Sequence, residues 1–464
     1  MMKPFTVETL CHWTKGKLQQ GDMSTLIRGV KIDSRMVQSE DLFIPIAGDR
    51  FDGHDFILQA AQAGAAATFI MSETHRHDQL SSSFAVIAVN DTLQALQEMA
   101  HHYRLQYQFP MIAITGSNGK TTTKDMVASV LNVMKPVLKS HANYNNHIGL
   151  PLTLMQITPE HAFAVLEMGM SGIGEISLLS RLAKPDIAVI TNVGWAHIEK
   201  LGSIDQIGAA KLEIIDGLSS DGVLLINGDD LRLAGISADK KNFPRVVKTG
   251  LLDNNDLQAV DVCSEGPTGF SFKTNRTGRY RFVINHPGIH HIISGLFAVW
   301  IGLEWGMPAS HIQQGFDQFT PSGMRMEIES KNGRTFINDS YNANPDSMKA
   351  ALQYLKSYPA HKRYAVLGNM LELGNYAESC HRDMAVEWFE AGIDHLVTLG
   401  DMASWIAQEA MQIGAERSRI YEASDVDDVI DYLNRTTKKG DVILVKGSRA
   451  MGMERIIKGQ KEGE

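Results

Sequence analysis

A glycine-rich segment in the first half of the chain has the composition of a polyphosphate-binding loop. It follows a short apolar run and reads TGSNGKTTT at residues 115–123. Backbone N–H groups between Gly116 and Gly119 can turn toward an anion, and the start of the next helix adds positive potential. Lys120 can reach the outer phosphate oxygens, and the hydroxyl of Thr121 is a suitable ligand for Mg²⁺.

The loop departs from the strict GxxxxGK[ST] pattern, because Ile114 stands where the first glycine would be. The alternative is a Gly-Asn turn that merely connects a strand to a helix. We disfavour it, since strand, loop and helix follow one another in the required order. The residues expected to contact the nucleotide are Thr115, Gly116, Ser117, Asn118, Gly119, Lys120, Thr121 and Thr122.

Three more side chains are candidates for the chemistry of this site. Two of them end or follow a predicted strand, and the third lies on a predicted helix. Glu167 ends an apolar run, and a carboxylate there is a hard oxygen ligand that suits Mg²⁺. Its alternative role is to cap the next helix. His197 follows the run 187–190, where a histidine by itself is more often a hydrogen-bonding loop residue than a ligand. Lys211, considered alone, is an ordinary solvated lysine of a helix.

The elements that must position these residues alternate between strand and helix, which predicts an α/β fold in three domains. Residues 1–105 read as a small α/β domain. Residues 106–318 read as a P-loop-type domain with a mainly parallel sheet, and Glu167 would face the phosphate loop at its carboxyl edge. Residues 319–464 alternate again and predict a Rossmann-like domain.

Composition limits the possible function classes. Of 464 residues, 44% are hydrophobic and 21% charged, which is the balance of an ordinary globular protein. A formal net charge of -9 gives no general attraction to nucleic acid or anionic lipid, so neither is expected as a partner. Three scattered cysteines without a CxxC pair predict neither disulfides nor a zinc ribbon. With no apolar run long enough for a membrane span and no signal-like start, we expect a cytoplasmic protein.

The motifs together resemble the Mur ligases, a family of ATP-dependent amide ligases related to folylpolyglutamate synthases. Besides the phosphate loop, the resemblance rests on EMG at 167–169, NVGWAH at 192–197 and AKLE at 210–213. It implies ATP and two Mg²⁺ ions as cofactors. It also implies that Thr121, Glu167 and His197 are metal ligands, and that Lys211 carries CO₂ as a carbamate that supplies ligand oxygens. The implied catalytic set is Lys120, Glu167, His197 and Lys211.

Two motifs in the last third of the chain resemble the family's C-terminal ATP contacts. Arg325 lies in SGMRM and Asp339 in NDSYNANP. The resemblance implies that the arginine approaches the γ-phosphate and the aspartate the ribose hydroxyls, so that this domain closes over ATP. Without the family, residues 342–345 are simply a turn before a helix, with Pro345 at a position that a helix start tolerates.

The chain departs from the family pattern in the region that contacts adenine. The usual G-x-H-N-x-x-N reads GIHHIIS at 288–294, which keeps His290 but replaces both asparagines by His291 and Ser294. Serine is shorter than asparagine and has a hydroxyl in place of the amide. How residues 291 and 294 meet adenine is therefore open. The phosphate and metal motifs are intact, so we do not expect an inactive relative.

The N-terminal and C-terminal motifs indicate the substrates. DSR at 33–35 with DGHDF at 52–56 resembles a UDP-binding pattern that folylpolyglutamate synthases lack, although the segment alone is equally consistent with a generic polar loop. DSYNANPDSM and LGNMLELG match members that add D-alanyl-D-alanine to UDP-N-acetylmuramoyl-tripeptide, and the DNPR signature for diaminopimelate is missing. The implied UDP-substrate contacts are Ser34, Arg35, Asn143 and Asn146, and the implied dipeptide contacts are Tyr341, Asn342 and Asn344.

Two other functions are weighed against this interpretation. A sister ligase would add a different amino acid and would be distinguished by the amine that stimulates ADP release. A regulator that uses ATP only as a switch is disfavoured, because it has no need of the lysine, carboxylate and histidine set. The third residue of the tripeptide, diaminopimelate or lysine, cannot be read from the motifs. The family resemblance implies a monomer.

Overall fold

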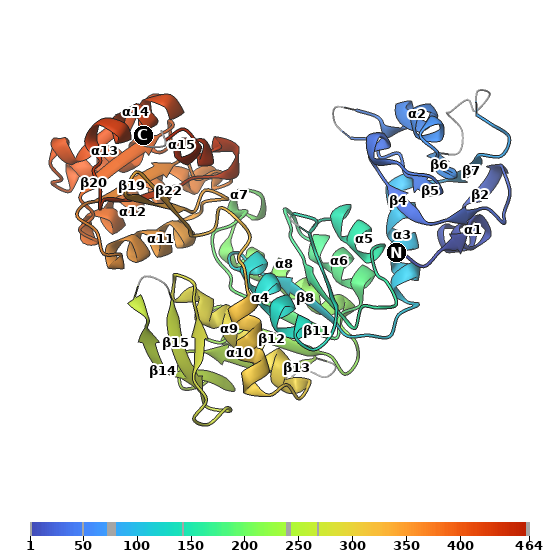
Figure 1. Ribbon diagram of the computed structural model, residues 1–464, viewed down its shortest axis with the longest axis horizontal. Coiled ribbons are helices and arrows are strands. Elements are labelled where there is room, and N and C mark those ends of the chain that lie inside the picture. The colour runs from blue at the N-terminus through green and yellow to red at the C-terminus, as the bar shows by residue number, and fades with distance from the viewer. Residues whose placement is uncertain are drawn as a thin grey trace.

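The computed structural model describes residues 2–48, 51–71, 80–141, 143–237, 243–266 and 269–460. They form three lobes that follow one another along the chain, with the central lobe between the other two (Figure 1). We call them the N-terminal lobe (β1 to α3), the central lobe (β8 to α10) and the C-terminal lobe (β17 to α15, together with residues 324–326, which lead into β17). Within the described ranges, no helix combines the length and apolar character that crossing a membrane requires.

The N-terminal lobe is built on a five-stranded sheet in the order β2-β7-β6-β5-β4, in which only β2 is antiparallel to its neighbour. Helix α2 covers one face, and α1 and α3 cover the other. The strands are β1 (Phe5–Thr6), β2 (Lys17–Gln20), β3 (Leu26–Ile27), β4 (Gly29–Lys31), β5 (Asp41–Phe43), β6 (Ala67–Met71) and β7 (Ala85–Val89), and the helices α1 (Val7–Thr14), α2 (Ile57–Gln62) and α3 (Thr92–Arg104).

The central lobe contains a nine-stranded sheet in the order β16-β15-β14-β13-β12-β11-β8-β10-β9. The strands from β8 to β14 are parallel, whereas β15 and β16 add an antiparallel edge that the sequence pattern did not predict. They are β8 (Met111–Thr115), β9 (Val137–Lys139), β10 (Phe163–Glu167), β11 (Ile187–Ile190), β12 (Val223–Asn227), β13 (Arg245–Gly250), β14 (Leu257–Ser264), β15 (Phe270–Thr274) and β16 (Phe282–Ile284).

Both faces of the central sheet are buried, which explains the unbroken apolar runs of its strands. On β8, Ile112 and Ile114 pack on one side of the sheet, while Met111 and Ala113 pack on the other. The first side is covered by α4 (Lys120–Asn132), α9 (His290–Glu304) and α10 (Ala309–Gln318). The second is covered by α5 (Gly149–Leu154), α6 (Glu175–Ala183) and α8 (Ile204–Leu212), with the short α7 (Ile198–Leu201) beside them.

The C-terminal lobe has a six-stranded sheet in the order β17-β18-β22-β19-β20-β21, parallel except for β17. Helices α11, α12 and α13 pack on one face and α14 and α15 on the other. The strands are β17 (Glu327–Lys331), β18 (Arg334–Asn338), β19 (Arg363–Gly368), β20 (His395–Leu399), β21 (Ile420–Ala423) and β22 (Val442–Lys446). The helices are α11 (Pro345–Ser357), α12 (Ala377–Glu390), α13 (Ser404–Gln412), α14 (Val426–Thr436) and α15 (Glu454–Lys458). The predicted α/β class with parallel sheets is thus confirmed.

A buried arginine joins the N-terminal lobe to the central lobe. Arg104, in the last turn of α3, donates from Nε to the carbonyl of Ala183 at 2.9 Å and from Nη2 to that of Lys184 at 3.4 Å. These carbonyls lie at the end of α6, where a positive charge is favourable because the last carbonyls of a helix lack partners within the helix. Arg104 therefore orients the N-terminal lobe on the central sheet.

Replacing Arg104 by methionine is expected to lower the free energy of unfolding by about 3 kcal/mol, because the change leaves buried carbonyls without a donor. Urea unfolding followed by circular dichroism would measure the loss. Arg181→Met is the matched control, since this exposed arginine makes only a 3.6 Å contact with Asp216. Its effect should stay within about 0.5 kcal/mol. Equal losses in both variants would contradict the role given to Arg104.

Candidate functional site

The phosphate loop joins β8 to α4 at the carboxyl edge of the central sheet, where parallel α/β sheets bind their ligands. Two of its glycines have backbone angles that other residues rarely adopt, with φ at 150° for Gly116 and 78° for Gly119. A Cβ at Gly116 would lie 1.8 Å from Oγ1 of Thr191. The loop can therefore hold this shape only with glycine at that position.

Replacing Gly116 by alanine is expected to weaken ADP binding by more than about tenfold and to cost about 2 kcal/mol of folding free energy. Titration calorimetry with ADP and urea unfolding would measure the two effects. Gly235→Ala serves as the control, because no atom lies within 4 Å of a Cβ added there and its φ is not positive. A tenfold loss of ADP affinity in the control, or none in Gly116→Ala, would refute this explanation.

The loop after β11 holds the phosphate loop in place. The backbone N–H of Ser117 donates to the carbonyl of Asn192 at 3.1 Å, and that of Asn118 donates to Oδ1 of Asn192 at 2.8 Å. Thr191 donates its hydroxyl to the carbonyl of Asn118. The sequence analysis expected these two N–H groups to face an anion, but the structure uses them to fix the loop. A helix leaves the N–H groups of its first turn without acceptors inside the helix, so the start of α4 can offer such groups to an anion.

Lys120 lies over the loop that precedes it. Its Nζ donates to the carbonyl of Gly116 at 2.8 Å and to that of Ser117 at 3.3 Å. Burial lowers the pKa of Lys120, nearby Glu167 opposes the shift, and Arg325 adds to it. The ammonium is therefore held among backbone oxygens beside the helix start, in a position to meet phosphate oxygens.

Glu167 is the buried acidic centre of the site. It ends β10, and its Oε2 accepts from the hydroxyl of Thr121 at 2.8 Å. Its Oε1 accepts from Nδ2 of Asn145 at 2.8 Å, and Nζ of Lys124 lies 3.9 Å from Oε2. The structure thus brings together Thr121 and Glu167, two of the predicted metal ligands. A carboxylate beside a hydroxyl is a donor set that fits Mg²⁺.

His197 and Lys211 have different surroundings. His197 adopts a left-handed backbone with φ at 66°, and its Nδ1 lies 2.6 Å from Oε2 of Glu372 in the C-terminal lobe. The hydrogen bond with His197 lowers the pKa of Glu372. Lys211 is only 1% exposed. No acceptor among the described residues bonds its amine, and burial, followed by the charge of Lys120, lowers its pKa well below the usual value.

No group of three or more His, Cys, Asp or Glu side chains that could hold an ion together occurs within the described ranges. The predicted metal site would therefore depend on the hydroxyl of Thr121 and on oxygens that a carbamate on Lys211 would add. The structure contains the carboxylate and the buried amine that such a site requires.

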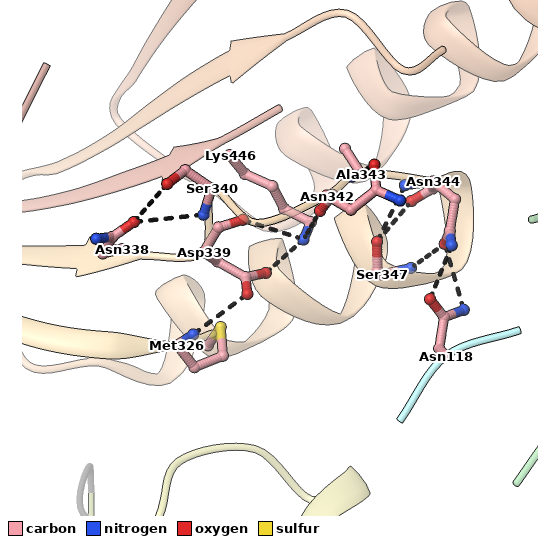
Figure 2. A network of polar contacts seen from close by, with 10 residues as sticks. All are labelled: Asn118, Met326, Asn338, Asp339, Ser340, Asn342, Ala343, Asn344, Ser347 and Lys446. Atoms are coloured by element: carbon pink, nitrogen blue, oxygen red, sulfur yellow. Dashed lines mark hydrogen bonds and ion pairs between the residues drawn. The ribbon is translucent and has the colours of Figure 1, made fainter. Parts of the chain in front are cut away.

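The C-terminal lobe reaches the phosphate loop through Arg325. Its Nη2 donates to Oγ1 of Thr121 at 3.1 Å, and its guanidinium lies 4.0 Å from the centre of the Tyr341 ring. Tyr341 therefore orients the arginine by a cation–π contact. Asp339 forms an ion pair with the buried Lys446 and accepts from the backbone N–H of Met326 at 3.2 Å (Figure 2).

The two asparagines expected near a dipeptide have structural partners. Asn342 accepts from Nζ of Lys446 through its carbonyl at 3.1 Å, and its side-chain amide is exposed beside the turn. Asn344 caps α11 by accepting from the N–H of Ser347 at 3.0 Å, and its amide also contacts Asn118 (Figure 2). Asn344 is thus part of the joint between the central and C-terminal lobes.

The residues that replace the family asparagines pack inside the central lobe. Ser294 on α9 hydrogen-bonds Oγ1 of Thr123 on α4 at 2.9 Å, and both are buried. His291 is also buried, and burial lowers its pKa well below the usual value, with His290 and His286 adding to the shift. His290 itself is exposed at the start of α9. Ser294 therefore contributes to the contact between α9 and α4.

The residues predicted to bind the UDP-linked substrate lie on two lobes. Ser34 is buried and donates to Oε1 of Gln59 at 3.0 Å. Arg35 is exposed, and it donates two hydrogen bonds from its side chain and one from its backbone N–H to Asp33, which lower the pKa of that carboxyl to about 2. Asn143 and Asn146 are exposed in the central lobe, before α5. Among the described residues, no hydrogen bond or ion pair joins these two pairs.

Sequence reasoning missed several residues of the site. Lys124 follows Lys120 by one helical turn, so helix periodicity could have indicated that both lie near Glu167. Asn145 belongs to the NYNN run, in which its two neighbouring asparagines were chosen instead. Asn192 and Glu372 belong to the quoted motifs NVGWAH and LGNMLELG, which could have marked them as candidates, although only the packing of loops distant in sequence brings them to the site.

Family models match nearly the whole chain. A model described as "Mur ligase family, catalytic domain" matches residues 26–104, and "Mur ligase middle domain" matches residues 114–301. A third, "Mur ligase, glutamate ligase domain", matches residues 324–449. The three matches follow the order of the three lobes.

Individual relatives agree with these matches. The chain is 41% identical, over 98% of its length and 97% of the relative's, to UDP-N-acetylmuramoyl-tripeptide–D-alanyl-D-alanine ligase of Bacillus subtilis. It is similar to a crystal structure of MurF from Acinetobacter baumannii, with a TM-score of 0.90, 29% identity and 98% of each chain covered. It is also similar to MurF of Thermotoga maritima in complex with ADP, with a TM-score of 0.80, 26% identity and 93% of this chain and 96% of that one covered. The chain therefore belongs to the Mur ligase family.

Proposed function

We propose that this protein joins D-alanyl-D-alanine to UDP-N-acetylmuramoyl-tripeptide, using ATP and releasing ADP and phosphate. The observation that carries the proposal is the contact of Arg325 with Thr121, because it brings a cation of the C-terminal lobe to the start of α4 beside Lys120 and Glu167. A γ-phosphate held there would be enclosed by two lobes. The names of the relatives, at 41% identity for the Bacillus subtilis ligase, support this choice of substrates.

The proposed reaction has two steps that need positioning and charge neutralisation more than covalent chemistry. The carboxylate of the tripeptide attacks the γ-phosphorus of ATP, the bond to the ADP oxygen breaks, and an acyl phosphate forms. The dipeptide amine then attacks the acyl carbon, loses a proton, and phosphate leaves. Lys120 and Arg325 would neutralise the transferring phosphoryl group from opposite lobes, and the closed lobes would keep water from the acyl phosphate.

We infer that Thr121 and Glu167 would hold Mg²⁺, with His197 and a carbamate on Lys211 completing two ion sites. Such ions would offset the negative charge of the phosphates. The hydroxyl of Thr121 and a carboxylate oxygen of Glu167 lie 2.8 Å apart and are both buried. The buried amine of Lys211 supports carbamate formation, because only a neutral amine reacts with CO₂ and burial favours that form.

The remaining assignments concern substrate recognition. Asp339 would contact the ribose and His290 the adenine side of ATP. Ser34, Arg35, Asn143 and Asn146 would contact the UDP-linked substrate, whereas Tyr341, Asn342 and Asn344 would contact the dipeptide. We also propose that the protein works in the cytoplasm as a monomer, in the synthesis of the peptidoglycan precursor on which cell-wall growth, cell shape and division depend.

The first test measures ADP release with ATP, Mg²⁺ and UDP-N-acetylmuramoyl-tripeptide. D-Alanyl-D-alanine is compared with D-alanine, D-glutamate and diaminopimelate as the amine. Turnover with the dipeptide alone would support the proposed reaction. Turnover with another amine would keep the chemistry but make the enzyme a sister ligase. ATP binding without turnover for any amine would refute the proposal.

A further inference from the structure

A pair of asparagines forms a direct contact between the phosphate loop and the C-terminal lobe. Nδ2 of Asn344 donates to Oδ1 of Asn118 at 2.7 Å, and Nδ2 of Asn118 donates to Oδ1 of Asn344 at 3.3 Å (Figure 2). Each amide thus both donates to and accepts from the other. Asn344 is only 7% exposed, whereas Asn118 is half-buried, so the pair is partly shielded from water.

The asparagine at position 344 does more than its helix requires. As the cap of α11, it uses only Oδ1, which accepts from the N–H of Ser347 at 3.0 Å. Serine or aspartate caps a helix about as well as asparagine. Only an amide side chain, however, carries its acceptor and its donor on separate atoms, so that one can cap the helix while the other reaches a second partner. Nδ2 of Asn344 is the atom directed at the phosphate loop, so the amide serves the lobe contact.

The partner of Asn344 is presented from a rigid position. The backbone of Asn118 is bonded on both sides, its N–H to the side chain of Asn192 and its carbonyl to the hydroxyl of Thr191. Asn118 lies two residues before Lys120, on the loop that would hold the phosphates. A shift of α11 relative to this loop must therefore break the amide pair.

Neighbouring contacts dock the same end of α11 on the central lobe. Oδ2 of Asp346 accepts from the backbone N–H of Trp195 at 3.3 Å. A Cβ at Gly194 would lie 2.0 Å from that oxygen, so glycine permits this close approach. Gly194 in turn exchanges hydrogen bonds with the hydroxyl of Ser117 in the phosphate loop. The start of α11 and the phosphate loop are thus joined by two routes.

We propose that Asn118 and Asn344 are positioning residues that lock the C-terminal lobe onto the phosphate loop. This inference rests on the proposed function for its consequence, which is that the lock holds the amine in line with the acyl phosphate. Without the pair, ATP is still cleaved, but the acyl phosphate is hydrolysed more often before the amine attacks. The pair therefore couples ATP cleavage to amide formation.

The test uses Asn118→Ser, Asn344→Ser and the double variant. Serine at 344 keeps an oxygen that can cap α11, and serine at 118 leaves the backbone bonds of the loop in place. Ser347→Ala is the matched control, because it removes the second half of the same capping box but leaves the amide pair. All four variants have their ADP affinity and thermal unfolding measured alongside the wild type.

Amide and ADP are counted in the same reaction mixture. Each single variant is expected to form amide about tenfold more slowly and to yield less amide per ADP, and Asn344→Ser, which changes no residue assigned to the nucleotide, should keep its ADP affinity within about threefold. The double variant should form amide no more slowly, and yield no less amide per ADP, than either single variant. Each single substitution already removes the same interaction. Ser347→Ala should keep the wild-type ratio of amide to ADP. Additive losses, an unchanged ratio in the single variants, or a lowered ratio in the control would overturn the proposal.

A second measurement does not depend on the substrates. The N–H of Trp195 donates to Asp346, and the N–H of Glu199 donates to the carbonyl of Glu372, so both amides report the docking of the C-terminal lobe. Their hydrogen exchange should be about tenfold faster in Asn118→Ser and Asn344→Ser and unchanged in Ser347→Ala. If the wild type shows no turnover with any amine, the proposed function fails. The hydrogen-exchange rates alone then test whether the asparagine pair holds the two lobes together. Unchanged exchange in both asparagine variants would then overturn the lock.

Discussion

Lys120→Met is expected to lower the rate of ADP release about a thousandfold while leaving the fold intact. Nζ of Lys120 lies among the loop carbonyls at the start of α4, where it can exchange those contacts for phosphate oxygens. Methionine has a similar length but no charge, so the transition state for phosphoryl transfer would lose a cation on the side of the central lobe. Arg325 could not compensate, because it approaches from the other lobe and is held by Thr121 and Tyr341.

Steady-state and single-turnover measurements of ADP release would quantify the loss. The control is Lys135→Met, which removes an exposed lysine just after α4 and should retain full activity. Thermal unfolding of Lys120→Met should be unchanged or raised, because burial already disfavours the charged form of this lysine. A variant that retains even a tenth of the wild-type rate would show that Lys120 does not meet the transferring phosphoryl group.

Lys211→Met is expected to reduce turnover by a similar factor, about a thousandfold, if the carbamate supplies the ligand oxygens that the described residues do not. The amine is 1% exposed, and its pKa is lowered well below the usual value, first by burial and then by Lys120. Burial therefore favours the neutral amine, which in the proposed modification would attack the carbon of CO₂ with loss of one proton. The proposed carbamate would carry a negative charge within electrostatic reach of Lys120, whose positive charge disfavours a protonated Lys211.

The modification makes a prediction of its own about CO₂ and pH. The native mass of the wild type should exceed the sequence mass by one CO₂, and acidification should remove it, because protonation reverses carbamate formation. Activity should fall in CO₂-free buffer and return with bicarbonate, whereas Lys211→Met should respond to neither. Full activity of the wild type in CO₂-free buffer, without the added mass, would contradict the carbamate.

The interlobe contacts also bear on the choice between an enzyme and a nucleotide switch. Arg325 contacts Thr121, and Glu372 contacts His197, so both lobes contribute to one site around the phosphate loop. A switch needs only a lobe movement, whereas this arrangement surrounds the place of phosphoryl transfer with cations and a buried carboxylate. We therefore favour catalysis, and the amine panel remains the measurement that separates the two.

Local patterns in the sequence were sufficient for the phosphate loop and for the α/β class. Glycines at 116 and 119, followed by Lys120, predict a loop shape that depends on backbone angles and on the helix that follows, and these are local properties. The strands around Glu167 are apolar throughout because both faces of the central sheet are covered, which makes them recognisable without any tertiary information. The domain boundaries near 105 and 318 remain predictions.

Only the tertiary structure decided which side chains meet across the lobes. In the sequence, Asn344 lies in a predicted turn. In the structure it caps α11 and also pairs with Asn118, which lies 226 positions away in the chain. Ser294 read as a missing adenine contact and proved to bond Thr123 inside the central lobe. Hydrogen bonds of this kind depend on how separate elements pack together. That packing cannot be predicted from the residue types and spacing within one segment. The sequence by itself therefore determined the chemistry of the loop, and the packing of the lobes determined its partners.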